Sequence, residues 1–192
     1  MENSNNNEYY FPLVEWEIRD FDSEGYILDL GGGGEGVIGQ LKGSDVVAID
    51  FQKEELLESA DGPLKIVMDA RELKFLDDSF QAVTAFFSLM YVRKKEDQLL
   101  VFQEAGRVLK PGGTLHFWDV DISKKPKTDS KYFIVHLKYH IGDIVTETGY
   151  GMVWPEGSRG IDYYLDLANQ AGFKPGEPEW QGNTFYLRLV KR

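Results

Sequence analysis

Five glycines stand within six positions directly after a short apolar run, at residues 27–36, which read ILDLGGGGEG. Glycine has no Cβ, so its backbone can adopt positive φ angles and come close to a bound molecule. A glycine-rich loop between a strand and a helix also turns the N-terminal amides of that helix toward a ligand. A tight turn alone needs only one glycine. We therefore predict that residues 31–36 hold a cofactor.

Two kinds of cofactor are compatible with the glycine spacing. Gly31, Gly33 and Gly36 satisfy the pattern G-x-G-x-x-G, and Asp50 follows about 20 residues later. In nicotinamide dinucleotide sites, an acid at that distance binds a ribose hydroxyl. The glycines alone therefore do not identify the ligand.

Two further acids and a chain break help to decide between these cofactors. Asp29 stands two residues before the first glycine, where a carboxylate repels a pyrophosphate but attracts an amino group. Asp69 ends the third predicted strand and can accept a hydrogen bond from an adenine amino group. Pro111-Gly112-Gly113 separates a helix from the fifth predicted strand. Together these features favour a ligand with an amino group and an adenosine moiety but no pyrophosphate.

Short apolar runs alternate with helical patterns through most of the chain. Apolar runs bounded by glycine or polar residues are typical of buried strands in a parallel sheet. The alternation of strands with helices predicts an α/β domain. The predicted strands are 26–30, 45–50, 64–69, 80–87 and 114–120, the predicted helices are 34–42, 51–60, 96–109 and 161–173, and a closing antiparallel strand pair is predicted at 173–190.

Residues 121–157 interrupt this alternation. Apolar residues recur at every second position of 131–141, and Gly142-Asp143 follows as a two-residue turn. The pattern predicts a β-hairpin in which Lys138 lies opposite Glu147. We interpret this hairpin as a cap over the site rather than as part of the core.

Four segments in this order, ILDLGGGGEG, VVAID, IVMDARELKFLDDSF and RVLKPGGTLHFWD, resemble the motifs of class I S-adenosylmethionine-dependent methyltransferases. The resemblance implies an α/β fold with a three-layer, doubly wound, seven-stranded and mostly parallel sheet. Its last strand would be antiparallel, and a β-hairpin would be inserted after the fifth strand. On this basis we expect residues 1–192 to form a single methyltransferase-like domain, with 1–24 as a lead-in segment and 121–157 as a cap or hairpin insertion.

The same resemblance implies cofactor contacts for individual residues. Asp29 and the backbone of residues 31–33 would hold the methionyl end of S-adenosylmethionine. Asp50 would bind the ribose hydroxyls, and Phe86 would line the reacting end. The full set implied is Asp29, Gly31, Gly32, Gly33, Asp50, Phe51, Met68, Asp69, Ala70 and Phe86, with Phe51, Asp69 and Ala70 beside the adenine.

Two positions depart from the family pattern. Glu35 occupies the place of the family's third glycine, and Gly36 comes one position late, so we expect a slightly different loop shape. Gln81 replaces an acid that is common near the start of the fourth strand.

No catalytic residue is assigned from the sequence. A sulfonium is an activated electrophile, so placement and water exclusion can supply much of the acceleration of methyl transfer. A general base is needed only when the acceptor holds its proton at neutral pH. The candidate bases are His136, His140, Asp119 and Asp121, and the candidates for an aromatic lid are Tyr9, Tyr10, Trp16, Tyr150 and Trp154.

A metal site on the predicted hairpin is the less favoured interpretation of its polar residues. His136 and His140 share one face of the hairpin with Glu147, and two histidines with a carboxylate could bind a metal. A solvent-exposed polar face explains the same pattern, so we predict no metal.

The composition limits the classes of partner that the protein can bind. The chain has 32 acids against 21 bases and a net charge of -11, which argues against a nucleic-acid backbone or an anionic membrane as partner. There is no cysteine, so disulfides and thiolate chemistry are excluded. The N-terminal residues lack the pattern of a signal peptide, and no apolar run reaches the ~18 residues of a membrane helix. We therefore expect a soluble, cytoplasmic protein.

Methyl transfer from S-adenosylmethionine to a small molecule is the leading hypothesis. The alternatives are a non-catalytic S-adenosylmethionine-binding protein and an NAD(P)-dependent oxidoreductase. Asp29 and Asp69 argue against the oxidoreductase. The acceptor, the methylated atom and the oligomeric state stay open at this level.

Overall fold

The larger of two β-sheets forms the centre of the molecule. The computed structural model describes residues 7–192, so most of the Asn-rich start of the chain lies outside the described residues. The strand order is β10-β12-β7-β6-β3-β4-β5, and β11 also pairs with β12. The strands are β3 (Ile27–Leu30), β4 (Val46–Asp50), β5 (Leu64–Val67), β6 (Phe80–Phe86), β7 (Leu109–Val120), β10 (Phe173–Pro175), β11 (Glu179–Gln181) and β12 (Thr184–Lys191).

The sheet is mixed, in agreement with the predicted α/β class. Strands β5, β4, β3, β6 and β7 run parallel to one another, whereas β12 is antiparallel to β7. The predicted count of seven strands is wrong by one. The chain ahead of β12 pairs with it in two short pieces, β10 and β11, rather than in one strand.

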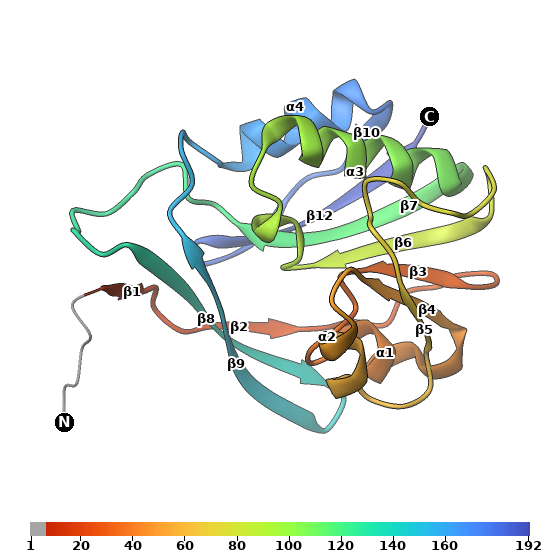
Figure 1. The fold of residues 1–192 in the computed structure, drawn as a ribbon, viewed down its shortest axis with the longest axis horizontal. Coiled ribbons are helices and arrows are strands. Elements are labelled where there is room, and N and C mark those ends of the chain that lie inside the picture. The colour runs from red at the N-terminus through yellow and green to blue at the C-terminus, as the bar shows by residue number, and fades with distance from the viewer. Residues whose placement is uncertain (1–6) are drawn as a thin grey trace.

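Helices α3 (Lys95–Val108) and α4 (Ile161–Gln170) cover one face of this sheet, as Figure 1 shows. Phe102 of α3 and Tyr164 of α4 are buried against Phe117 of β7, with ring centroids 5.7 and 5.0 Å from the ring of Phe117. The shorter helices α1 (Val37–Lys42) and α2 (Lys53–Glu58) pack toward the opposite face, where they share that face with a second sheet. Two 3-10 turns, η1 (Gly43–Asp45) and η2 (Leu89–Tyr91), complete the helical elements of the described residues.

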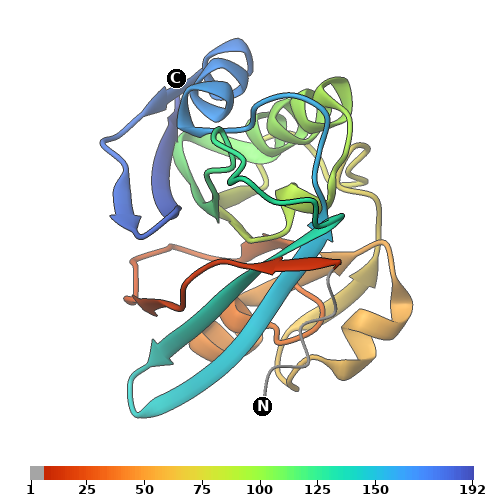
Figure 2. The ribbon, with the colours of Figure 1, turned by 90° about the vertical axis from the view of Figure 1, so that its left-hand side faces the viewer.

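The second sheet contains the predicted hairpin. Strand β8 (Tyr132–Ile141) pairs with β9 (Ile144–Val153) across the two-residue turn, and Lys138 lies opposite Glu147 as predicted. The hairpin is not alone, because β1 (Glu8–Tyr10) and β2 (Val14–Glu17) both pair in parallel with β8. Figure 2 shows these lead-in strands lying along β8.

The prediction that the hairpin is not part of the core is wrong. Alternate residues of β8, including Phe133 and Leu137, are fully buried. They belong to the same hydrophobic cluster as Ile27 of β3 and Val46 of β4. Burial of this apolar face stabilises the folded protein, by about 25 cal/mol for each Å² of apolar surface removed from water. The hairpin is therefore part of the hydrophobic core. On this side of the sheet, the expected helical layer is therefore partly replaced by β-structure.

The Pro111-Gly112-Gly113 segment also differs from the prediction. It lies within β7 instead of before it, and the pairing of β6 with β7 shifts register between Phe80 and Ala82. A Cβ on Gly113 would lie 2.9 Å from the carbonyl oxygens of Gln81 and Lys110. The glycine thus permits a local irregularity in the strand where a side chain has no room.

One buried hydrogen bond joins the two sheets. The indole Nε1 of Trp16 on β2 donates to Oγ1 of Thr184 on β12 over 2.8 Å, and both residues are buried. Thr184→Val keeps the shape of the side chain but leaves the indole N–H without its acceptor. We expect the free energy of unfolding to fall by about 1–3 kcal/mol, the cost of an unsatisfied buried donor.

Urea unfolding of Thr184→Val, followed by tryptophan fluorescence, measures this loss. The matched control is Thr146→Val on β9, a half-buried threonine distant in sequence from that contact. An equal loss in the two variants would contradict a specific role for the Trp16–Thr184 hydrogen bond.

Candidate functional site

A cavity of about 1200 Å³ lies at the carboxyl ends of β3, β4, β5 and β6. In open α/β sheets, ligands bind outside these strand ends. Gly149 and Tyr150 of β9 contribute to its lining from the second sheet. The predicted site residues that line it are Gly31, Gly33, Asp50, Phe51, Met68, Asp69, Ala70 and Phe86, whereas Asp29 and Gly32 do not.

The glycine loop is closely packed on its protein side. Gly31 has a φ of 73°, and a Cβ there would lie 2.4 Å from Cβ of Ser88. A Cβ on Gly33 would lie 2.5 Å from Cβ of Glu55. The backbone amides of Gly31 and Gly32 both donate to the carbonyl of Ile49, over 2.8 and 3.0 Å. These two amides are therefore engaged by the protein, while Gly31 and Gly33 still line the cavity.

Asp29 lies beneath the loop rather than in the cavity. It is buried, and Oγ1 of Thr84 donates to its carboxyl oxygen over 2.6 Å. Burial raises the pKa of Asp29 to about 7. A Cβ on Gly32 would lie 2.6 Å from the second oxygen of Asp29. Asp29 therefore packs under the loop. The sequence predicted that Asp29 would contact the cofactor, but it does not line the cavity.

Asp50 combines a structural contact with an available oxygen. Its Oδ1 accepts a hydrogen bond from the amide of Gln52 over 2.8 Å, directly before α2. Its Oδ2 lies 3.1 Å from the Cβ position of Gly33, at the edge of the cavity. One oxygen therefore holds the start of α2, while the other points toward the glycine loop.

The α2 side of the cavity is acidic. Glu55 and Glu58 line the cavity with Asp50 and Glu35. Burial, together with the charges of these neighbours and Glu54, raises the pKa of Glu55. A cationic group is therefore favoured at this side of the cavity.

Asp69 is held by an arginine. Nε and Nη2 of Arg71 donate to its two oxygens over 2.6–3.0 Å, and Arg71 also reaches Asp97 over 3.1 Å. This contact lowers the pKa of Asp69. Phe51, the neighbouring predicted site residue on β4's carboxyl end, is 72% exposed. Its ring is available to cover a flat group.

Aromatic side chains form the end of the cavity next to β6. The rings of Phe87 and Tyr150 are stacked, with centroids 5.4 Å apart and an interplanar angle of 3°. Phe86 packs edge-on against both, at centroid distances of 5.0 and 6.2 Å. Phe87 has a φ of 50°, which costs a non-glycine residue about 1–3 kcal/mol and is concentrated at functional sites. Tyr150 was among the predicted lid residues, but no sequence pattern identified Phe87.

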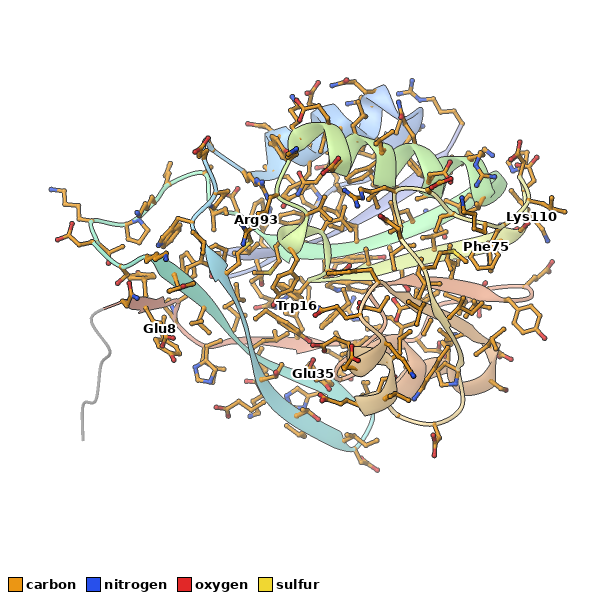
Figure 3. All side chains as sticks on the ribbon, in the orientation of Figure 1. Glu8, Trp16, Glu35, Phe75, Arg93 and Lys110 are labelled. Atoms are coloured by element: carbon orange, nitrogen blue, oxygen red, sulfur yellow. The ribbon has the colours of Figure 1, made fainter. Side chains whose placement is uncertain are left out.

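Glu35 connects the glycine loop to the second sheet (Figure 3). Its carboxylate accepts hydrogen bonds from Oγ1 of Thr148 and from the hydroxyl of Tyr150, the latter over 3.1 Å. Sequence analysis noted only that Glu35 replaces a glycine. Its partners lie more than a hundred positions along the chain, so no local pattern predicts them.

The candidate bases and metal ligands lie outside the cavity. Asp119 is fully buried, which raises its pKa to about 7, and Oδ2 of Asp121 accepts the amide of Ile161 at the start of α4. His136 and His140 lie on the outer face of the second sheet, where they contact Glu147 and Glu15. Residues 7–192 contain no group of three or more His, Cys, Asp or Glu residues that could hold a metal ion.

The other predicted lid residues are distributed over the second sheet. Trp16 is in the core, while Tyr9 and Trp154 pack against Phe11. Tyr10 is exposed. Only Tyr150 of this predicted set reaches the cavity.

The family model described as a methyltransferase domain matches residues 28–117, which include the glycine loop and the strand ends around the cavity. Residues 28–117 are thus similar to a methyltransferase domain. The class I methyltransferase identification made from the four motifs is thereby confirmed.

Curated relatives include the putative methyltransferase YqeM of Bacillus subtilis, which is 34% identical over 125 residues, or 60% of this chain and 50% of that protein. The demethylmenaquinone methyltransferase of Clavibacter sepedonicus is 43% identical over 101 residues, or 46% of this chain and 38% of that protein. The chain thus matches half or less of the length of these relatives.

Solved structures of S-adenosylmethionine-dependent methyltransferases share the fold of this methyltransferase domain. One from Methanosarcina mazei has a TM-score of 0.65 at 18% identity and covers 89% of this chain and 94% of its own. Another, from Mesorhizobium loti, has a TM-score of 0.60 at 17% identity and covers 86% of this chain and 90% of its own. At these identities the likeness concerns the fold. In the described part of the chain, no helix is long and apolar enough to cross a membrane.

The raised pKa of Asp29 predicts a pH-dependent stability of the methyltransferase domain. Between about pH 4 and 7, folded Asp29 keeps a proton that the unfolded chain releases, so the free energy of unfolding falls as pH rises. Asp29→Asn removes this dependence and can still accept the hydrogen bond from Thr84. Between about pH 5 and 8, we expect the variant to gain up to about 3 kcal/mol relative to the wild type, at about 1.4 kcal/mol per pKa unit.

Urea unfolding of both proteins at the two pH values measures this difference. The buried Asp119 titrates in the same sense, but it is present in both proteins and cancels in the comparison. A stability difference that does not change with pH would show that Asp29 ionises normally in the folded protein.

Proposed function

We propose that this methyltransferase domain transfers the methyl group of S-adenosylmethionine to a small-molecule acceptor. The observation that carries the proposal is the convergence of Asp50, Asp69 and Phe86 on one cavity beside the glycine loop. These residues lie at the carboxyl ends of three different strands, and a tight turn alone does not require them to meet. The family match and the named activities of the relatives support the same conclusion.

The residues around the cavity fit this cofactor. The free oxygen of Asp50 would accept hydrogen bonds from the ribose hydroxyls. Met68, Asp69 and Ala70 would surround the adenine edge, and the exposed ring of Phe51 would cover the adenine face. The acidic lining near α2 suits a cofactor with a sulfonium and an amino group.

The bound cofactor would supply an activated methyl group for in-line displacement. The protein's task is then to place the acceptor and exclude water, which supplies much of the acceleration in such reactions. Phe86, Phe87 and Tyr150 suit this task because they form an apolar wall that is already packed together.

Several observations support a small acceptor. The aromatic wall suits an apolar or flat molecule, and relatives are named demethylmenaquinone methyltransferase and 2-methoxy-6-polyprenyl-1,4-benzoquinol methylase. The net charge of -11 does not suit a nucleic-acid acceptor.

We also propose that the lead-in segment and the hairpin belong to the same single domain and that the protein acts in the cytoplasm.

A nicotinamide dinucleotide is less well supported. Its pyrophosphate requires free amides at the glycine loop. The amides of Gly31 and Gly32 are already bonded to Ile49. We therefore retain the methyltransferase as the proposed function.

Calorimetric titration with S-adenosylmethionine, S-adenosylhomocysteine and NAD tests the proposal. We expect the first two ligands to bind and NAD not to bind. Asp50→Ala removes the acceptor for the ribose hydroxyls and should weaken both sulfur ligands by about tenfold to a hundredfold, as loss of hydrogen bonds to a charged group does.

Asp45→Ala is the matched control, because Asp45 lies at the opposite end of β4. This variant should bind as the wild type does. Tight NAD binding without a response to the sulfur ligands would refute the proposed function. Unchanged affinity of Asp50→Ala for the sulfur ligands would refute the proposed contact between Asp50 and the ribose hydroxyls.

A further inference from the structure

Glu35 contacts the second sheet directly through its side chain, and its backbone is linked to that sheet through Gln40 of α1. The side chain accepts hydrogen bonds from Thr148 and Tyr150, which project from the same face of β9. The backbone carbonyl accepts a 2.5 Å hydrogen bond from Nε2 of Gln40, which also lies 3.3 Å from the hydroxyl of Tyr139 on β8. Both strands of the hairpin are therefore linked to one residue of the glycine loop.

We propose that Glu35 is a positioning residue that couples cofactor binding to the placement of β9 over the reacting end. Ligand at the glycine loop would fix Glu35, and Glu35 would fix Tyr150. This inference rests on the proposed function, because it assumes that the glycine loop contacts S-adenosylmethionine.

A continuous set of contacts runs from the loop to the aromatic wall. Tyr150 stacks on Phe87, and Phe87 is flanked by Ser88. Ser88 abuts the Cβ position of Gly31 and donates to the carbonyl of Leu30 over 2.6 Å. The set of contacts thus closes on the glycine loop at two points, Glu35 and Gly31. Movement of β9 away from the cavity must break the hydrogen bonds to Glu35 or separate the stacked rings.

The chemistry of the contact suits a strong coupling. Hydrogen bonds to a carboxylate are about twice as strong as those between neutral groups. Tyr150 is largely buried, and burial together with the charge of Glu35 raises the pKa of its hydroxyl well above the usual value. The tyrosine hydroxyl therefore keeps its proton and donates it in the hydrogen bond to Glu35 at any physiological pH.

Three variants separate the contributions of this contact. Glu35→Ala removes the carboxylate, Tyr150→Phe keeps the ring but removes its hydroxyl, and the double variant tests whether the two effects are coupled. S-adenosylhomocysteine is the probe. Stopped-flow measures the rate at which S-adenosylhomocysteine leaves the site. Hydrogen exchange of residues 144–153 measures how well the bound ligand protects the backbone amides of β9.

We expect S-adenosylhomocysteine to dissociate about tenfold or more faster from Glu35→Ala, and ligand-induced protection of residues 144–153 to disappear. Tyr150→Phe should show a smaller effect, of about threefold to tenfold. The double variant should be no worse than Glu35→Ala, because both changes break the same contact. Circular dichroism and urea unfolding check that each variant is folded.

Glu147→Ala is the matched control. Glu147 lies on the same strand but contacts His136 on the outer face. It should leave both dissociation and exchange unchanged. Wild-type rates and protection in a folded Glu35→Ala would overturn the coupling alone. Failure of the wild type to bind S-adenosylhomocysteine would instead overturn the proposed function, and this inference with it.

Discussion

The site depends on the absence of side chains in the glycine loop. Ser88 follows β6, Glu55 belongs to α2, and Asp29 lies in β3, and each occupies space that a Cβ in the loop would need. Three elements of the fold therefore meet around residues 31–33 at contact distances that only glycine permits. The main structural role of these glycines is to let the three elements pack against the loop. The cavity forms on the side of the loop that these contacts leave open.

The buried acid below the loop belongs to the same arrangement. Asp29 is held by Thr84 and has no access to the cavity, so its carboxyl group acts as a packed, hydrogen-bonded support. Asp50 and Glu55, by contrast, do face the cavity and lie on its α2 side. The site thus separates acids that support the loop from acids that can meet a ligand, although the sequence places Asp29 and Asp50 at equivalent strand ends.

The strand-end residues that line the cavity were predictable because each stands at or just after the end of a strand with a clear apolar run. Partners across the fold were not. Whether Arg71 bridges Asp69 and Asp97 depends on side-chain geometry, and the contact of Glu35 with Tyr150 depends on how β9 crosses the molecule. In the lead-in segment the sequence indicated a short helix or strand without deciding between them, because the three or four residues of β1 and β2, of mixed aromatic and acidic character, show no clear period.

Parallel pairing of the lead-in strands with β8 has a consequence for folding. Val14 pairs with Leu137, so the first described strands cannot complete their sheet until most of the chain is available. Contacts between such distant positions carry a high loop-closure entropy and form late. In the larger sheet, β3 pairs with β4 over a much shorter stretch of chain. Strands β1 and β2 are therefore expected to join β8 after the glycine loop has formed.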